Sequence, residues 1–226
     1  MNMKFSTLLH FDWQGRCVLN ERAEVLTPML APMGEHGWPP ALAGQRLDAL
    51  AALDALARHD TPMQRPPVGI IGPREANEAQ CRLAATLGER LAQLAVPVLC
   101  GGRGGVMEAA GRGAAEAGGT VIGLLPDNHW ESANPWITLP LASGLGEARN
   151  VVIARASTVL IAVGNSPGTL TEVAFGCHFG RCVLGLDSAP QMAGCTPLEN
   201  AEQAVALTAA ALWGCLPTHG GETSEG

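Results

Sequence analysis

The pattern of hydrophobic and polar positions divides the chain near residue 60. Residues 4–26 alternate loosely between the two kinds of side chain and contain a turn sequence at Gln14-Gly15, so we predict a β-hairpin there. Leucines recur at helical spacing over residues 41–58, which follow two prolines and predict a helix. Three prolines in residues 60–67 interrupt both patterns, and we place the end of an N-terminal unit, residues 1–65, within them.

From residue 68 onward, short apolar runs alternate with stretches of helical spacing. The apolar runs predict buried strands at residues 68–72, 96–100, 120–125, 158–163 and 182–186. The other stretches predict a helix after the first strand and helices at residues 105–117, 147–156, 169–179 and 198–213. Strands that alternate with helices form parallel sheets with right-handed crossovers. We therefore predict an α/β fold, a Rossmann-like doubly wound parallel sheet over residues 66–216, with the β-hairpin and helix added before it and a disordered tail at 217–226.

The bulk composition limits the classes of function. A net charge of −7 and a pI near 5.3 argue against nucleic-acid binding, which relies on a basic surface. No apolar run is long enough to span a bilayer, and polar residues interrupt the first fourteen positions, which argues against a membrane protein and a secretory signal. The seven cysteines are scattered and odd in number, which favours reduced thiols in the cytoplasm. Lys4 is the only lysine, so an enzyme that needs a pyridoxal Schiff base is disfavoured.

Two glycine-rich turns, each after an apolar run and before a helix, carry the strongest chemical signal. The first turn consists of Gly101, Gly102, Arg103, Gly104 and Gly105, and it leads into Val106 and Met107. Glycine lets backbone amides approach a phosphate closely, and the N-terminus of the next helix adds partial positive charge. A tight turn without a ligand is the alternative. The spacing matches neither the dinucleotide fingerprint nor a Walker motif, so classical NAD and P-loop functions are disfavoured.

The second turn contains Asn165, Ser166, Gly168 and Thr169. Thr169 is placed to cap the following helix or to give its hydroxyl to a phosphate. Glu172 follows three residues later, and spacing alone does not separate its two interpretations. It either completes a capping box with Thr169, or it faces the pocket as a general acid or base or as an acceptor from ribose hydroxyls.

Two arginines and a glycine complete the predicted ligand site. Gly72 ends the first strand and Arg74 follows it, where its side chain either reaches a phosphate or is simply solvated. Arg149 begins a helix whose next residues are apolar, so a solvated role suits it less well than it suits Arg155. Because the carboxyl ends of parallel strands share one edge of the sheet, we expect these residues and both turns to meet there.

Two weaker features have ordinary structural explanations beside their chemical ones. Residues 177–182 contain two cysteines and a histidine, but no second ligand pair is near, so core thiols are favoured over a metal site. His129 and Trp130 follow the third predicted strand, where they cover a flat heterocycle or else pack in a surface loop or a subunit contact.

The motifs taken together resemble the Rossmann-like superfamily of the lonely-guy phosphoribohydrolases and DNA-processing protein A, whose members were once misnamed lysine decarboxylases. Residues 101–108 and 148–150 are most similar to its branch of molybdenum-cofactor carrier proteins. The resemblance covers residues 68–186 and leaves out the N-terminal hairpin and helix. It implies a homo-oligomer, either a dimer or a tetramer.

The resemblance also implies roles for single residues. In the hydrolase branch, the arginine of Glu-Arg-Lys and the glutamate of Pro-Gly-Gly-x-Gly-Thr-x-x-Glu assist cleavage of the N-glycosidic bond, and these positions correspond to Arg149 and Glu172, the implied catalytic pair. Asn150 stands in place of the lysine, and residues 164–167 replace Pro-Gly-Gly-x, so phosphate binding at the second turn is expected to be altered. In the carrier branch, the same cleft holds a phosphorylated, metal-bearing pterin without turning it over.

Two functional hypotheses therefore stand. The preferred one is a cytoplasmic binding or carrier protein for a phosphorylated heterocycle, either a nucleotide or the molybdenum cofactor, with no metal site of its own. The alternative is a nucleoside 5′-monophosphate phosphoribohydrolase. A partner-binding or assembly role for the N-terminal unit is left open.

Overall fold

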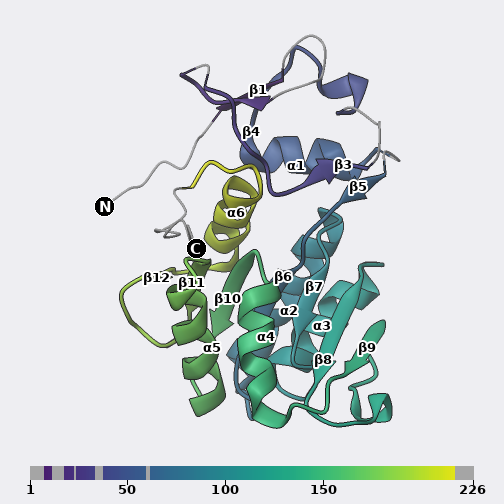
Figure 1. Cartoon of the computed structure of the whole chain (residues 1–226), viewed down its shortest axis with the longest axis vertical. Helices are drawn as coiled ribbons and strands as arrows, with labels where there is room; N and C mark the ends of the chain where they lie inside the picture. The colour runs from purple at the N-terminus through teal and green to yellow at the C-terminus, as the bar shows by residue number, and fades with distance from the viewer. Residues whose placement is uncertain (1–7, 12–17, 23, 34–37, 60–61, 217–226) are drawn as a thin grey trace, which may run out of the picture.

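The computed structural model describes residues 8–11, 18–22, 24–33, 38–59 and 62–216. At its centre lies a seven-stranded parallel sheet in the order β12-β11-β10-β6-β7-β8-β9, which confirms the predicted α/β class (Figure 1). The strands are β6 (Val68–Ile71), β7 (Val98–Cys100), β8 (Val121–Leu125), β9 (Leu139–Ala142), β10 (Val159–Val163), β11 (Cys182–Leu186) and β12 (Cys195–Pro197). The helices that follow them are α2 (Glu78–Gln93), α3 (Val106–Glu116), α4 (Arg149–Ala156), α5 (Pro167–His178) and α6 (Ala201–Leu212), with short 3-10 turns η2 (Trp130–Ser132) and η3 (Gly146–Ala148).

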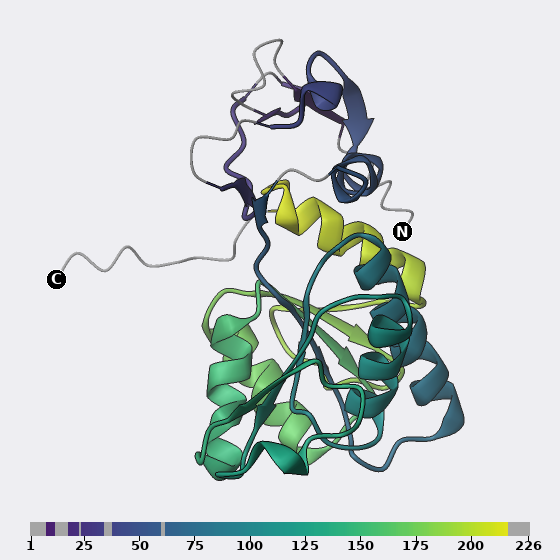
Figure 2. The same cartoon turned by 90° about the vertical axis from the view of Figure 1, so that its right-hand side faces the viewer.

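Helices cover the sheet from both sides, as the doubly wound pattern requires (Figures 1 and 2). Helices α4 and α5 lie on one face, where Ile153 and Val173 pack against Leu160 and Leu99 in the smaller of two apolar cores. Helices α2, α3 and α6 lie on the other face and share the larger core. Among the described helices, none combines the length and the apolar content needed to cross a bilayer.

The N-terminal unit packs on helix α6, at the end of the sheet opposite the carboxyl ends of the strands (Figure 1). It contains the antiparallel strands β1 (Leu8–Phe11), β2 (Val18–Leu19) and β4 (Arg46–Asp48), the 3-10 turn η1 (Pro40–Leu42), helix α1 (Ala49–Ala57), and a two-stranded sheet of β3 (Ala31–Pro32) and β5 (Met63–Gln64). Trp213 at the end of α6 is fully buried beside Phe11 and Trp38, and its indole N–H donates to the Ala49 carbonyl at 3.0 Å. The added unit therefore extends the core and leaves the carboxyl edge uncovered.

The structure confirms the predicted hairpin and corrects the predicted helix. Strands β1 and β2 pair antiparallel, whereas the predicted turn at Gln14-Gly15 lies outside the described residues. The helix predicted from residue 41 begins only at Ala49, because Arg46–Asp48 form a strand that pairs with β1. The Asp48 carboxylate then caps the helix by accepting from the Ala51 amide at 2.8 Å, which fixes its start.

Two strands of the sheet were not predicted from the pattern. Strand β9 lies between the strand predicted at 120–125 and the helix predicted at 147–156, and β12 lies beyond the last predicted strand, at 182–186. Each is short, contains a proline and occupies an edge of the sheet, where a missing backbone N–H is tolerated. Such strands lack the apolar run that identified the central ones.

Candidate functional site

A cavity of about 480 Å³ opens at the carboxyl ends of β6 and β10. These strands are neighbours in the sheet, but β6 continues into α2 on one face and β10 into α5 on the other. This is the switch point at which open parallel sheets bind their ligands. The cavity is lined by Gly72, Pro73, Arg74, Glu75, Met107, Glu147, Arg149, Asn150, Asn165, Ser166, Pro167, Gly168, Thr169 and Glu172.

Arg149 contributes a buried positive charge to this cavity. It is the first residue of α4, its side chain is only 4% exposed, and its Nη1 donates to the Leu124 carbonyl at 2.7 Å. The guanidinium lies against Gly101, where an added Cβ would come within 2.1 Å of Nη1. Its Nε is buried and has no hydrogen-bond partner within the described chain. Arg149 is therefore not a solvated surface charge, whereas its rival Arg155 is exposed and stacks over Phe179.

Glu172 faces the same cavity from α5. Its residue is 7% exposed, and burial raises the pKa of the carboxyl to about 8, partly offset by the positive charge of Arg149 and reinforced by Glu147. The carboxyl is therefore largely protonated at neutral pH. The capping-box interpretation of Glu172 is wrong, because the residue that caps α5 is Ser166 and the N-terminal boundary of the helix lies at Pro167.

Some hydrogen-bonding groups of the second turn are paired with each other. The Ser166 hydroxyl accepts from the Thr169 amide at 3.1 Å and shares a 2.8 Å hydrogen bond with the Thr169 hydroxyl. Pro167 has no N–H, so within the described chain the Gly168 amide is the donor in the first helical turn that has no protein partner. Altered phosphate binding at this turn stays a prediction.

The first turn lies beside the cavity and supports its wall. Gly105 has φ +66°, and a Cβ there would come within 2.3 Å of the Pro73 and Arg74 carbonyl oxygens. The Val106 amide donates to the Pro73 carbonyl at 3.1 Å, so the turn holds the segment after β6 in place. Of the residues predicted here, Met107 lines the cavity, whereas the glycines and Val106 do not. The amides of Gly104 and Met107 have no protein partner within the described residues, and their binding of a phosphate stays a prediction.

Arg103 ties the first turn to the loop between β8 and β9. Its guanidinium pairs with the Asp127 carboxylate, which also accepts from the Ser132 hydroxyl at 2.8 Å. The Asn134 side-chain amide donates to the Arg103 carbonyl at 2.9 Å. Sequence reasoning did not single out this network, because its members are spread along a loop with no motif spacing. Direct contact of Arg103 with a ligand stays a prediction.

Other candidates divide between the rim of the cavity and the remaining surface. Arg74 lies on the rim with its side chain 55% exposed, 3.9 Å from the Glu147 carboxylate. Asn150 lines the cavity, is 7% exposed and donates to the Thr171 hydroxyl at 3.0 Å. Trp130 is 60% exposed in its loop. The described residues contain no group of three or more His, Cys, Asp or Glu side chains that could hold a metal. Cys177 and Cys182 are partly buried, and burial raises the pKa of Cys182 to about 11.

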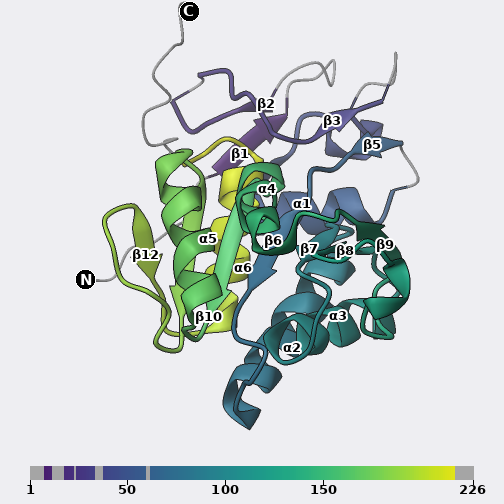
Figure 3. The same ribbon diagram turned by 60° about the horizontal axis from the view of Figure 1, so that its bottom comes forward.

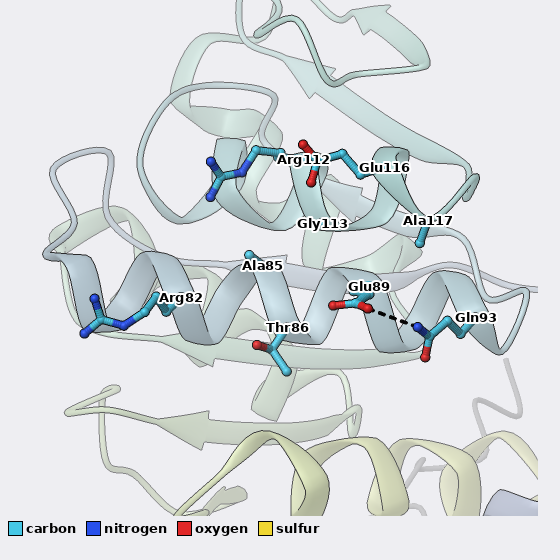
Figure 4. A pocket seen from close by; sticks show the side chains of 9 residues that line it. All are labelled: Arg82, Ala85, Thr86, Glu89, Gln93, Arg112, Gly113, Glu116 and Ala117. Carbon is cyan, nitrogen blue, oxygen red and sulfur yellow. Dashed lines mark hydrogen bonds between the residues drawn. The ribbon is translucent and has the colours of Figure 1, made fainter.

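A second hollow, of about 670 Å³, follows the groove between α2 and α3 (Figure 4). Arg82 and Arg112 lie at one end of it, and Glu89 and Glu116 lie toward the other. It contains none of the predicted site residues. Of these two cavities, the one at the carboxyl ends of β6 and β10 is the one that brings Arg149, Glu172 and the second turn together.

Comparisons with known proteins show which family the chain belongs to. The family model described as the SLOG cluster4 family matches residues 65–211. An uncharacterised protein of Archaeoglobus fulgidus is 36% identical over 138 residues, which cover 61% of this chain and 91% of that protein.

Two solved structures are similar over nearly their whole length. The molybdenum cofactor binding protein of Rippkaea orientalis is 30% identical, with a TM-score of 0.60, and the match covers 64% of this chain and 96% of that one. The molybdenum cofactor carrier protein of Chlamydomonas reinhardtii is 34% identical, with a TM-score of 0.62, and the match covers 66% and 99%. The family match begins at residue 65, so residues 1–64 of the N-terminal unit lie outside it.

Proposed function

Because the chain belongs to the SLOG cluster4 family, we propose that it binds or carries a phosphorylated heterocycle, with the molybdenum cofactor as first candidate and a nucleotide as second. The observation that carries this proposal is the buried Arg149 guanidinium at the carboxyl-edge cavity. Two solved relatives are named for the molybdenum cofactor that they bind or carry, and both are at least 30% identical to this chain.

The positive charge of Arg149 suits a phosphate. Burying a guanidinium is costly unless its hydrogen bonds are satisfied, and the Arg149 Nε has no partner within the described chain. A phosphate at the cavity would pair with this charge and accept a hydrogen bond from the Gly168 amide at the N-terminus of α5. Arg74 on the rim adds a second positive charge.

The uncharged polar groups of the cavity suit a heterocycle. Asn150, Asn165 and Ser166 present amide and hydroxyl groups, and the protonated Glu172 carboxyl adds a donor. A volume of about 480 Å³ lies within the usual range for small-ligand sites. The polar edges of a purine or a pterin would hydrogen-bond to these groups.

The phosphoribohydrolase is retained as a second candidate because of one observation. A carboxyl with a pKa of about 8 is protonated at neutral pH, which is the state required of a general acid that protonates a departing base. Arg149 would hold the phosphate and Glu172 would assist cleavage.

One experiment separates the two candidates. The purified chain and its Glu172→Gln variant are incubated with adenosine monophosphate, and released adenine and ribose 5-phosphate are measured by chromatography. The carrier proposal expects binding with no product from either protein. Product released by the wild type but not by Glu172→Gln would replace the carrier proposal with the hydrolase proposal.

We also propose a reducing, cytoplasmic setting. The six described cysteines are all unpaired. This pattern is ordinary where thiols are kept reduced.

A further inference from the structure

The strand order of the sheet is that of folds that bind a nucleotide in each of two halves. Strands β10, β11 and β12 follow one another in the chain and lie on one side of the switch point, whereas β6, β7 and β8 lie on the other (Figures 1 and 3). Counted from β10, the order across these six strands is 3-2-1-4-5-6, which is the order of doubly wound sheets that bind dinucleotides. The second turn follows β10, so it occupies the place of the phosphate-binding turn in those sheets.

An acidic residue of this chain occupies the place where such sheets hold a ribose. In them, a carboxylate about 20 residues after the phosphate-binding turn accepts a hydrogen bond from a ribose hydroxyl. Asp187 directly follows β11 and comes about 20 residues after the second turn. The Gly164 amide donates to the Leu186 carbonyl at 3.1 Å, which places Asp187 beside that turn. Within the described residues, the Asp187 carboxylate has no ion pair and no hydrogen bond, so it can accept from a ligand.

The turn that contains Asp187 has an unfavourable backbone conformation. Asp187 has φ +44° and Ser188 has φ +60°, and the Ala189 amide closes the turn by donating to the Leu186 carbonyl at 3.1 Å. Glycine is favoured in this left-handed region, and a side chain there lowers stability. Residues other than glycine that are kept in such conformations are concentrated at ligand and active sites. Here the two residues present a carboxylate and a hydroxyl at the carboxyl end of β11.

A third hollow, of about 440 Å³, opens at this turn, and we call it the β11 hollow. Asp187 and Ser188 contribute polar groups to its lining, and Ala189, Pro190 and Met192 contribute apolar surface. Met192 is 40% exposed, and its flexible thioether can adapt to a flat aromatic ring. The β11 hollow shares no lining residue with the cavity of Arg149 and Glu172, so it adds binding space that the proposed function does not use.

We propose that the β11 hollow binds a ribonucleoside part of the ligand, with the Asp187 carboxylate accepting from the ribose hydroxyls and the base packed on the apolar lining. This rests on the proposed function, because the phosphate that carries the ribose has to lie at the second turn. It goes further because it requires a ribose on that phosphate, which a phosphorylated pterin alone does not have. A second heterocycle joined through the phosphate would still occupy the cavity beside Glu172.

The groove between α2 and α3 lacks such an arrangement (Figure 4). It follows two helices instead of lying at strand ends, and its Arg82 is already paired with Glu78 at 3.1 Å. Glu116 in this groove is exposed and has no ion pair among the described residues. It therefore provides a control carboxylate away from the β11 hollow.

The test compares two nucleotides by calorimetric titration of the full chain. Adenosine monophosphate has the ribose 2′-hydroxyl, and 2′-deoxyadenosine monophosphate lacks it. We expect the wild type to bind the ribonucleotide roughly 10-fold more tightly, because the hydroxyl donates to a charged carboxylate. Asp187→Gly should bind both nucleotides equally, and Glu116→Ala should keep the wild-type preference. Glycine suits the φ of +44°, so Asp187→Gly should retain native circular dichroism.

Three results would overturn the ribonucleoside subsite. They are equal affinities of the wild type for the two nucleotides, binding of neither, and a preference that survives in Asp187→Gly. Titration of Glu172→Gln then shows whether Glu172 holds the ribose in place of Asp187. After any of these results, a phosphorylated molecule bound to the purified chain would still support the proposed function, so the two failures are distinguishable.

Discussion

Substituting Gly101 tests whether the first turn works by leaving room for Arg149. An alanine Cβ at position 101 would lie 2.1 Å from Nη1 of Arg149 and 2.8 Å from its Cζ, so the guanidinium must move away. It would then lose its 2.7 Å hydrogen bond to the Leu124 carbonyl. A hydrogen bond to a charged group contributes about 1.5–3 kcal/mol, and we expect a loss of this size in the free energy of unfolding.

Gly104 in the same turn provides the control. A Cβ at position 104 would meet nothing nearer than 3.7 Å, so Gly104→Ala should change stability little. Urea unfolding of both variants measures the difference. Calorimetric titration with adenosine monophosphate measures binding, which should weaken roughly 10- to 100-fold in Gly101→Ala relative to the wild type if Arg149 holds the phosphate. Equal stability of the two variants, together with wild-type affinity in Gly101→Ala, would refute this account of the turn.

Three further predictions concern the neighbouring turns and Glu172. Gly105→Ala should destabilise the protein by about 2–4 kcal/mol in urea unfolding, because it combines a left-handed backbone with overlap against the Arg74 carbonyl. A smaller loss of stability than in Gly104→Ala would contradict this prediction. Ser166→Ala should lower the free energy of unfolding by about 1 kcal/mol, because it removes the cap of α5. It should leave phosphate affinity the same or higher, because the Thr169 amide and hydroxyl lose their partner and become free to bind the ligand. Weaker binding would show that Ser166 itself contacts the ligand. Since the Glu172 pKa is raised from 4.5 to about 8, the folded state keeps a proton that the unfolded chain loses, so this stabilisation is complete below pH 4.5 and is lost as pH rises through 8. Stability should therefore fall with pH across this window by up to about 1.4 kcal/mol per unit, and Glu172→Gln should flatten the slope; parallel slopes in the two proteins would argue against a buried, protonated carboxyl.

The central sheet could be predicted from sequence because its strands are buried on both faces. Strands such as β10 are continuous apolar runs, so their positions and the turns after them are visible without a structure. The edge strands β9 and β12 could not be predicted in this way, because they are exposed and contain proline. The start of α1 was misplaced because the leucine spacing continues upstream of Ala49. The helix begins there because the Asp48 carboxylate accepts from the Ala51 amide and caps it.

The site was predictable in its members but only partly in their roles. Arg149 and Glu172 were identified from their motifs, and the structure places both at one cavity. The Leu124 carbonyl that holds Arg149 belongs to strand β8 and lies 25 residues earlier in the chain, so no local motif reveals this contact. The cap from Ser166, rather than a capping box of Thr169 with Glu172, depends on backbone geometry that spacing does not reveal.

Native mass spectrometry of the freshly purified full chain, combined with elemental analysis for molybdenum, tests the central proposal most directly. The account predicts that the wild type carries a bound, phosphorylated small molecule. It predicts that Arg149→Gln lacks this molecule while its circular dichroism stays native. If the ligand is the molybdenum cofactor, metal and pterin should disappear together. A wild type with no bound molecule, and no thermal shift with nucleotides or pterins, would contradict the proposal. The same ligand content in both proteins would contradict the role of Arg149.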